Sequence, residues 1–279
     1  MSSILTNNGA MVALQTLKAI NNDLTKTQNA ISTGKDIAAA KDNSAIWAIT
    51  KVMETDVSGF RAISNSLSLG ESTVAVASAG AEQVVNILND MKERIVAATG
   101  ENVDHSKLSA EVAAMNDQIT AIINGSQFNG ANLLRTDVDG NGAASLNVTA
   151  SLDRSGGTVT RTQISVTSAD FEAALAARTG IAVDTTANAT TALDTIETLI
   201  QAAVDGAAGL GASGKRISDQ NNFVGKVMDA MASGIGALVD TDMEAASARL
   251  QALQTQQQLG IQALSIANQA PQTILSLFR

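Results

Sequence analysis

The sequence predicts a mainly α-helical protein in which long antiparallel coiled-coil helices come from the two ends of the chain and flank a small β-hairpin insert. Three observations predict this fold class. Apolar residues recur at alternating steps of three and four along both ends of the chain. The single proline among 279 residues is Pro271, so long helices can run uninterrupted. In the middle of the chain the period changes to the alternation that is typical of strands.

Composition favours extended helix-on-helix packing over a compact globule. Aromatic residues make up only 2% of the chain, with no tyrosine and one tryptophan, whereas hydrophobic residues make up 45%. Aromatic side chains dominate most globular cores, and this chain lacks them. Its apolar content is instead mostly Ala, Leu, Ile and Val. Alanine is the best helix former and carries almost no side chain, so helices rich in it can approach closely.

Charge and residue usage exclude several function classes. The net charge is −9 and no basic stripe is present, which argues against nucleic-acid binding. The absence of cysteine excludes disulfides, thiol nucleophiles and zinc–thiolate sites. No apolar run is long enough to span a membrane, and the N-terminus lacks the regions of a cleaved signal peptide. These residues alone fit a cytosolic protein, and we expect neither enzyme activity nor a cofactor.

Three helices are predicted in the first half of the chain. The first runs to about residue 31 and ends at Ser32-Thr33-Gly34. The second, residues 46–98, has the strongest periodicity: over seven heptads only Asp56 and Gly70 break the apolar pattern, and such a helix is roughly 80 Å long. Thr99-Gly100 ends it. The third, shorter helix carries one apolar face formed by Leu108, Val112, Met115, Ile119 and Ile122.

The second half begins with short strands and returns to helix. Between residues 124 and 170 two alternating runs predict short β-hairpins, namely Leu146, Val148, Ala150 and Leu152, then Ile164 and Val166. A short helix is expected over residues 170–178. Helix resumes over 192–203, a flexible glycine-rich stretch follows at 206–214, and a second long helix then begins. Its apolar seam shifts by one residue at Val239. The two long helices most simply pair antiparallel.

The chain ends predict assembly with other copies. The first charged residue is Lys18, and residues 250–278 contain no charged residue, while one face of that segment is rich in glutamine. Solvated helices normally carry Glu and Lys, and membrane helices lack this many amides. Its ten or so large apolar side chains contribute about 1.5–3 kcal/mol each when fully buried. Ordering the backbone costs about 1–2 kcal/mol per residue. We therefore expect ends that are disordered in the free subunit and ordered in a polymer.

Five short segments carry a resemblance to a known family. Each is a weak signal alone, but together and in this order they are specific. They are Ile31–Lys35, Ala40–Ala45 with Ala48-Ile49, Phe128–Leu134, Leu210–Ala212 with Lys215–Ile217, and Ala267–Gln272 with Ile274–Leu277. Over residues 1–135 and 192–279 the chain resembles the bacterial flagellins.

The resemblance implies a phase-1 flagellin-like fold and a structural subunit that polymerises into the extracellular flagellar filament for swimming motility. It implies export through the flagellar type III apparatus without a cleaved signal peptide. The implied partners are other copies of the chain, other flagellins, the export machinery with its chaperone, and hook-associated and cap proteins, with no nucleic acid and no membrane. The implied domains are 1–44 (N-terminal filament-core helix), 45–135 (N-terminal outer-layer helices), 136–191 (short β-rich variable insert), 192–236 (C-terminal outer-layer helix) and 237–279 (C-terminal filament-core helix).

The family motif and the apolar seam together predict the residues of the polymerisation interface. They are Leu17, Ile20, Leu24, Ile31, Leu250, Leu253, Leu264, Asn268, Gln269, Pro271, Gln272, Leu275 and Leu277.

Other motifs have simpler interpretations. Residues 137–142 match the start of a calcium loop, but the twelfth position is Val148 rather than glutamate, so we interpret the segment as a turn that leads into a hairpin. His105 is the only histidine, and we expect a solvated loop residue rather than a metal ligand or catalytic base. Asn147 and Asn188 head glycosylation patterns that we attribute to chance.

Competing functions stay open at this point. A hook–filament junction protein shares similar terminal segments but would form one short ring instead of a long filament. A coiled-coil signalling module is a different class and needs charged, exposed helix ends, which residues 250–278 do not have. An enzyme is the weakest alternative, because the sequence contains no catalytic constellation.

Overall fold

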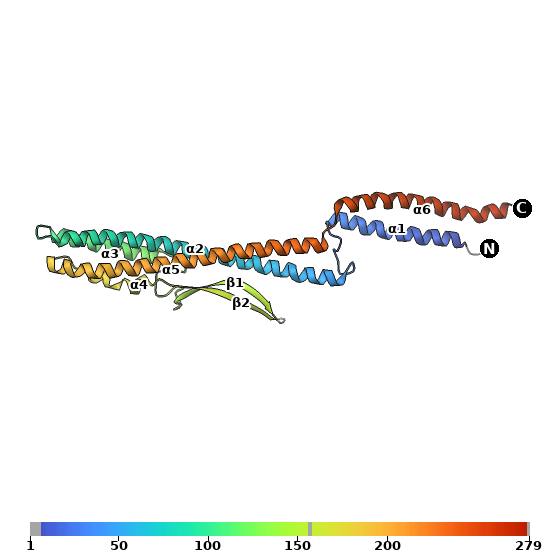
Figure 1. Ribbon diagram of the computed structural model, residues 1–279. Coiled ribbons are helices and arrows are strands. Elements are labelled where there is room, and N and C mark those ends of the chain that lie inside the picture. Colours follow the sequence, from blue (N-terminus) through green and yellow to red (C-terminus); the bar gives the residue numbers. More distant parts are fainter. Residues whose placement is uncertain (1–6, 156–157, 278–279) are drawn as a thin grey trace. The chain divides into compact units, whose positions relative to one another are not determined.

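The computed structural model describes residues 7–155 and 158–277, and the side chains among them except those of 154, 155, 158 and 270–277. Its elements, labelled in Figure 1, confirm the predicted fold class of long helices and a small antiparallel sheet. They are α1 (Asn8–Thr33), α2 (Ser44–Ala98), α3 (His105–Gly125), β1 (Ser145–Ser155), β2 (Thr158–Thr167), α4 (Phe171–Ala174), the 3₁₀ helix η1 (Ala176–Gly180), α5 (Thr186–Val239) and α6 (Met243–Leu277). The chain divides into two compact units, residues 58–229 and residues 1–57 with 230–279.

The larger unit, residues 58–229, is organised around α2 and α5, which pair antiparallel as predicted. The Ser64 hydroxyl donates to Asn221 Oδ1 at 2.8 Å, and near the other end Lys92 forms an ion pair with Glu197. Every seam residue of α2 from Ile63 to Ala98 is buried, including Gly70, so the heptad prediction is confirmed over this stretch. The part of the core that α2 contributes therefore follows directly from its apolar period.

The expected flexible break at residues 206–214 is wrong. Helix α5 continues from Thr186 to Val239 through all the glycines of this stretch. A Cβ on Gly206 would overlap the Phe171 ring, and one on Gly214 would lie 3.3 Å from Val74 Cγ1. Glycine at these two positions lets a ring from α4 and a side chain from α2 approach the α5 backbone. Tertiary packing thus outweighs the poor helix propensity of glycine.

The insert is one two-stranded hairpin rather than several short ones. Strands β1 and β2 are antiparallel, with Leu146 opposite Val166 and Val148 opposite Ile164. Val148, Ile164 and Val166 are buried, as their alternation predicts. A Cβ on Gly70 would lie 2.6 Å from Val148 Cγ2. The absence of a side chain at position 70 therefore lets Val148 of the hairpin pack directly against the α2 backbone.

A β-bulge at Ala150 ties the same hairpin to α5. The pairing register shifts between Thr149 and Ser151, so Ala150 has no partner opposite it on β2. Its carbonyl oxygen accepts a hydrogen bond of 2.9 Å from Gln220 Nε2 instead. The bulge thereby directs a backbone carbonyl group toward α5 instead of toward β2. The hairpin is thus held by both α2 and α5.

The Phe128–Ala131 segment forms a tight turn. Phe128 and Ala131 exchange backbone hydrogen bonds of 2.9 and 3.0 Å. The two central residues, Asn129 and Gly130, have φ of 50° and 84°. A two-residue turn with positive φ at both centres is of type I′, for which Asn-Gly is the preferred pair.

The smaller unit, residues 1–57 and 230–279, contains the two terminal helices. Helix α1 ends at Thr33, and Gly34 caps it in the left-handed conformation with φ 70°. Helix α5 ends at Val239, the residue at which the predicted seam shifts, and α6 begins at Met243. The Thr241 amide donates to Gly34 O at 2.9 Å, which begins the antiparallel alignment of α1 with α6.

Candidate functional site

The unit formed by residues 1–57 and 230–279 buries few of its side chains. Among its described residues, the buried ones are Thr27, Ala30, Thr50, Val239 and Leu253. By contrast, the core of the unit formed by residues 58–229 is continuous and includes fully buried side chains such as Leu67, Leu88 and Phe171. The terminal unit therefore has no continuous core of its own.

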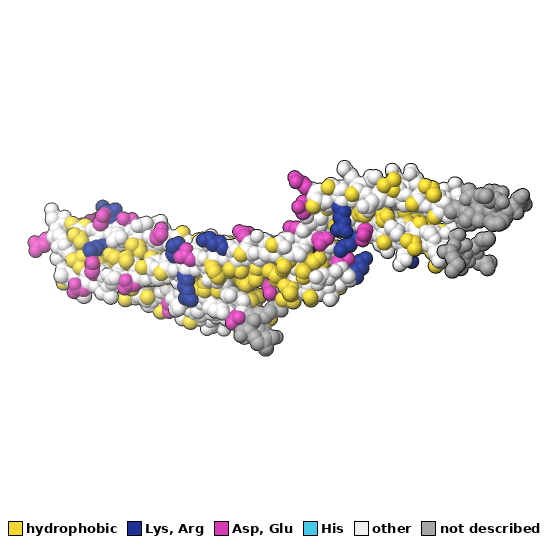
Figure 2. All heavy atoms as spheres, turned by 45° about the vertical axis from the view of Figure 1, so that its right-hand side comes forward, with side chains coloured by type: hydrophobic (Ala, Val, Ile, Leu, Met, Phe, Trp, Pro, Cys, Tyr) yellow, Lys and Arg dark blue, Asp and Glu magenta, His cyan; other side chains and the backbone are white. Residues whose placement is uncertain are grey.

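Large apolar side chains instead lie on the outer surface of the terminal helices. Ile266 is 70% exposed, Met11 64% and Val12 63%, and Leu14, Leu259 and Ile261 are each more than half exposed. Figure 2 shows hydrophobic side chains reaching the surface along this helix pair. An exposed apolar surface of this kind is typical of an interaction site.

Most of the predicted interface residues face the seam between α1 and α6. Leu253 is buried, and the six other apolar residues whose side chains are described are half-buried, namely Leu17, Ile20, Leu24, Ile31, Leu250 and Leu264. Asn268 and Gln269 are exposed. Pro271, Gln272, Leu275 and Leu277 fall outside the described side chains. The structure thus brings the seam residues together within one chain.

Sequence periodicity missed the outward apolar residues of the two helices. Met11, Val12 and Leu14 on α1, and Leu259 and Ile266 on α6, lie off the heptad stripe and are exposed. The signal was present in the sequence, because these apolar residues have no place on a single-seam helix that faces water. A second apolar face indicates a helix pair that is covered on more than one side.

Residues 137–142 form the turn that we expected. Asp137 Oδ1 accepts from the Gly140 amide at 2.9 Å, and Asp139 Oδ1 accepts from the amides of Asn141 and Ala143 at 2.9 and 3.2 Å. The hydrogen bond from the Asn141 amide, followed by that from Ala143, lowers the pKa of Asp139. Both carboxylates therefore serve the backbone of the loop, and within the described residues no group of three or more acidic or histidine side chains could hold a metal ion.

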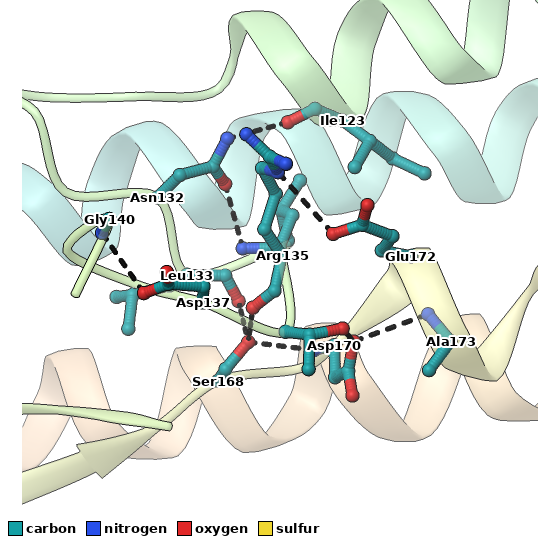
Figure 3. A network of polar contacts seen from close by, with 12 residues as sticks. Ile123, Asn132, Leu133, Arg135, Asp137, Gly140, Ser168, Asp170, Glu172 and Ala173 are labelled. Atoms are coloured by element: carbon teal, nitrogen blue, oxygen red, sulfur yellow. Dashed lines mark hydrogen bonds and ion pairs between the residues drawn. The ribbon is translucent and has the colours of Figure 1, made fainter. Parts of the chain in front are cut away.

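A polar network fastens residues 133–136, which precede this turn, to the start of α4 (Figure 3). The Ser168 hydroxyl donates to the carbonyl oxygens of Leu133 and Arg135 at 2.9 and 2.6 Å. Asp170, at φ 44°, accepts at Oδ1 from the Thr136 hydroxyl at 2.7 Å and also caps α4. These bonds fix a non-helical segment on the helical unit, which is a structural rather than a chemical task.

The same segment is held to α3 by a buried amide. Asn132 donates from Nδ2 to Ile123 O at 2.7 Å and accepts at Oδ1 from the Leu134 amide at 2.9 Å. Its side chain therefore makes a hydrogen bond through each end while excluded from water. Ile123 is one of the labelled residues of Figure 3.

The remaining polar groups of chemical interest also have structural roles. His105 begins α3 and is half-buried, not a solvated loop residue, and its Nδ1 donates to Val183 O at 2.9 Å. Arg178 is buried, and desolvation lowers its pKa, while its guanidinium donates to Leu175 O and to Thr120 Oγ1, both at 3.0 Å. Among the described helices, none is both long enough and apolar enough to cross a bilayer.

Comparison with known proteins identifies the family. The model of the bacterial flagellin N-terminal helical region matches residues 4–138, and that of the C-terminal helical region matches residues 193–278. Flagellin FljK of Caulobacter vibrioides is 40% identical over all of this chain and 99% of that protein. The chain belongs to the bacterial flagellin family. The matched regions agree with those that carried the resemblance in the sequence.

Two further similarities support this assignment and the fold. A flagellin of Brucella melitensis is 40% identical over the full length of both chains. A putative flagellar hook-associated protein from Vibrio parahaemolyticus aligns with a TM-score of 0.53 at 13% identity, covering 71% of this flagellin and all of that chain. The second similarity shows the fold alone.

Membership of the flagellin family establishes the role of this protein. This flagellin is a structural subunit of the extracellular bacterial flagellar filament, and it polymerises with copies of itself. It is not an enzyme. The exposed apolar surface of α1 and α6 is consistent with a protein whose working form is a polymer.

Proposed function

We propose that this flagellin polymerises through the unit of residues 1–57 and 230–279, and that the outward apolar side chains of α1 and α6 become buried between neighbouring copies. One observation carries the proposal: five described side chains of this unit are buried, whereas six large apolar side chains of α1 and α6 are more than half exposed. Full burial of such a side chain contributes about 1.5–3 kcal/mol. The residues of the seam would act by holding the two helices together.

The proposal assigns the parts of the chain to layers of the filament. Residues 1–44 and 237–279 form the filament core. Residues 45–135 and 192–236 form the surrounding layer, and residues 136–191 are the reduced outer insert. Support comes from the contrast between the well-packed unit of residues 58–229 and the sparsely packed terminal unit. In the free subunit we expect α1 and α6 to be unfolded, because one seam buries too little surface to order both helices.

Substitution on the outward face tests the interface. Ile266→Gln keeps a helix-compatible side chain but removes apolar area from a residue that is 70% exposed. We expect the critical concentration for polymerisation to rise about tenfold or more, since 1.4 kcal/mol corresponds to a factor of ten. Val159→Gln is the control, because Val159 is 55% exposed but lies on β2. Equal critical concentrations for both variants and the unmodified protein, measured by sedimentation, would contradict the proposal.

Export and partner proteins complete the proposed function. We expect the subunit to leave the cell unfolded through the flagellar type III apparatus with a chaperone, and to meet hook-associated proteins, the cap and other flagellins at the filament. Support comes from family membership and from the absence of cysteine, which leaves no disulfide to obstruct unfolding. Retention of the protein inside cells that lack a component of the export apparatus is the expected result. Undiminished secretion from those cells would refute this route.

A hook–filament junction role predicts a different product. A junction protein forms one short ring, whereas a filament subunit elongates without limit. Purified protein seeded with filament fragments should therefore grow fibres of micrometre length, which electron microscopy detects directly. Assembly that stops after one short ring would favour the junction role.

A further inference from the structure

The seam between α1 and α6 repeats in heptads, so the repeat by itself does not specify one alignment. All buried and half-buried described residues of α6 from Ala246 onward follow alternating steps of four and three; they are Ala246, Leu250, Leu253, Gln257, Gly260, Leu264 and Ala267. Helix α1 follows the same rule from Ala10 to Thr27. A slide of one heptad, about 10.5 Å, would again place one seam on the other.

We propose that Gly260 and Gln257 are the positioning residues that fix this alignment, by receiving Leu17 and pairing with Asn21. The proposal rests on polymerisation through the terminal unit. A Cβ on Gly260 would lie 3.2 Å from Leu17 Cδ1 and 3.9 Å from Ile20 Cδ1. The two α1 side chains therefore occupy space that a side chain at position 260 would fill. Gly260 is the one seam position of α6, among the seven from Ala246 to Ala267, that has no side chain.

Gln257, one turn before Gly260, adds a directional contact. Its Nε2 donates to Oδ1 of the exposed Asn21 at 2.6 Å, at the edge of the seam. If α6 slid by one heptad so that Gly260 faced Ala10 and Ala13, a void would replace the Leu17 contact, and Gln257 would face Leu14. Polar seam residues in coiled coils specify register in this way, because any other alignment leaves the amide without a partner once neighbouring copies cover the pair.

The alignment is anchored at two further points, one on each side of this contact. The Asp36 amide donates to Val239 O at 2.7 Å near the start of the pair. Asn7 Nδ2 donates to Ala267 O at 2.7 Å near its far end. Gly260 lies roughly 30 Å from Thr241 at 1.5 Å per residue, so its contact with Leu17 acts far from the backbone bonds at the start of the pair.

Fixing the register decides which surface the subunit offers to its neighbours. Met11 and Leu14 on α1 are exposed, as are Leu259 and Ile266 on α6. A slide of one heptad would move the α6 residues by about 10.5 Å relative to those of α1. Because the two helices are proposed to fold only during assembly, each incoming subunit must find the same alignment, and Gly260 with Gln257 would select it.

A hole-filling substitution tests the steric part. Gly260→Leu should raise the critical concentration for polymerisation about tenfold or more, because overpacking displaces Leu17. In the double variant Gly260→Leu with Leu17→Ala, the large side chain lies on α6 and the small one on α1. This variant should recover most of the lost polymerisation. Gly209→Leu in α5 is the matched control, since nothing lies within 4 Å of a Cβ there. Unimpaired polymerisation of Gly260→Leu, or no recovery in the double variant, would overturn the inference.

Removing the amide tests the specification of register. Gln257→Leu makes the seam more apolar, so filaments should still form, but electron microscopy should find more than one set of helical parameters among them. Uniform filaments with unchanged parameters would overturn the role of Gln257. These outcomes are distinct from failure of the proposed function. That failure would show as variants with replaced outward apolar residues that polymerise as well as the unmodified protein.

Discussion

Replacement of Gly206 by alanine tests how α4 is held against α5. A Cβ at this position would overlap Cε1 of the Phe171 ring and lie 3.1 Å from Ala169 Cβ. Phe171 is fully buried, so the ring cannot move aside into solvent. Overpacking of this kind costs about 1–3 kcal/mol. The gain in helix propensity from glycine to alanine offsets about 1 kcal/mol of it.

A matched control isolates the steric term. Gly209 lies one turn further along α5, is exposed, and a Cβ added there would have no neighbouring atom within 4 Å. Gly209→Ala should therefore stabilise the protein by about 1 kcal/mol, from propensity alone. Because both substitutions share that gain, the free energies of unfolding of the two variants should differ by about 1–3 kcal/mol.

Urea denaturation of the monomer, followed by far-ultraviolet circular dichroism, measures this difference. In thermal unfolding the Gly206 variant should melt several degrees below the Gly209 variant, since 1 kcal/mol shifts the midpoint by about 2–4 °C in a unit of this size. Combining Gly206→Ala with Phe171→Leu should give a loss smaller than the sum of the single losses. Equal stabilisation by Gly206→Ala and Gly209→Ala would refute the packing argument.

Three further predictions concern the turn, the loop and a surface ion pair. Gly130→Ala should destabilise the protein by about 1 kcal/mol, because φ at this position is 84°. Gly125→Ala is the control and should not destabilise it, since position 125 has open space around it and no positive φ. Urea denaturation compares the free energies of unfolding of the two variants. Asp139→Ala should speed hydrogen exchange of the two amides that its carboxylate accepts from, and unchanged protection would count against its capping role. Hydrogen bonding to Lys51, together with the charges of Lys51 and Lys35, lowers the pKa of Glu54 from 4.5. The stability that the ionised Glu54 contributes to the folded protein is therefore present above that value and is lost as the pH falls through the lowered pKa. Glu54→Gln should accordingly make the free energy of unfolding less dependent on pH in this acid range.

The helical seams could be predicted from the sequence because one physical rule produces them. Residues from Ile63 to Ala98 are buried at the predicted heptad positions, since a helix pair buries one stripe of each partner. At the near end of the same seam Ile49 is 55% exposed. Periodicity therefore identified the apolar face of α2 but not which of its residues are covered.

The continuity of α5 could not be predicted, because it depends on contacts distant in sequence. Local propensity favours a break where four glycines fall within nine residues. The structure shows that Gly206 and Gly214 are places where Phe171 and Val74 approach the helix backbone. The sequence alone does not distinguish a glycine that allows close packing of a neighbouring side chain from one that makes the backbone flexible.

The outward residues of the candidate site were missed for a related reason. The heptad pattern selects Leu17 and Leu264, which pack between α1 and α6. Ile266 and Met11 fall outside the pattern and are the most exposed of the large apolar side chains that the structure describes. Distinguishing a seam from an outer contact requires the number of helices around the pair, which a single sequence does not state.

The absence of charge near the C-terminus has an environmental consequence. No ionisable side chain occurs between Leu250 and Phe278. Ionic strength weakens attractions between charges, and protonation alters only groups that titrate, so the contacts contributed by this segment respond to neither. Contacts formed by apolar and amide groups alone would be neither screened in brine nor lost by titration across the pH range that a swimming cell meets outside its envelope.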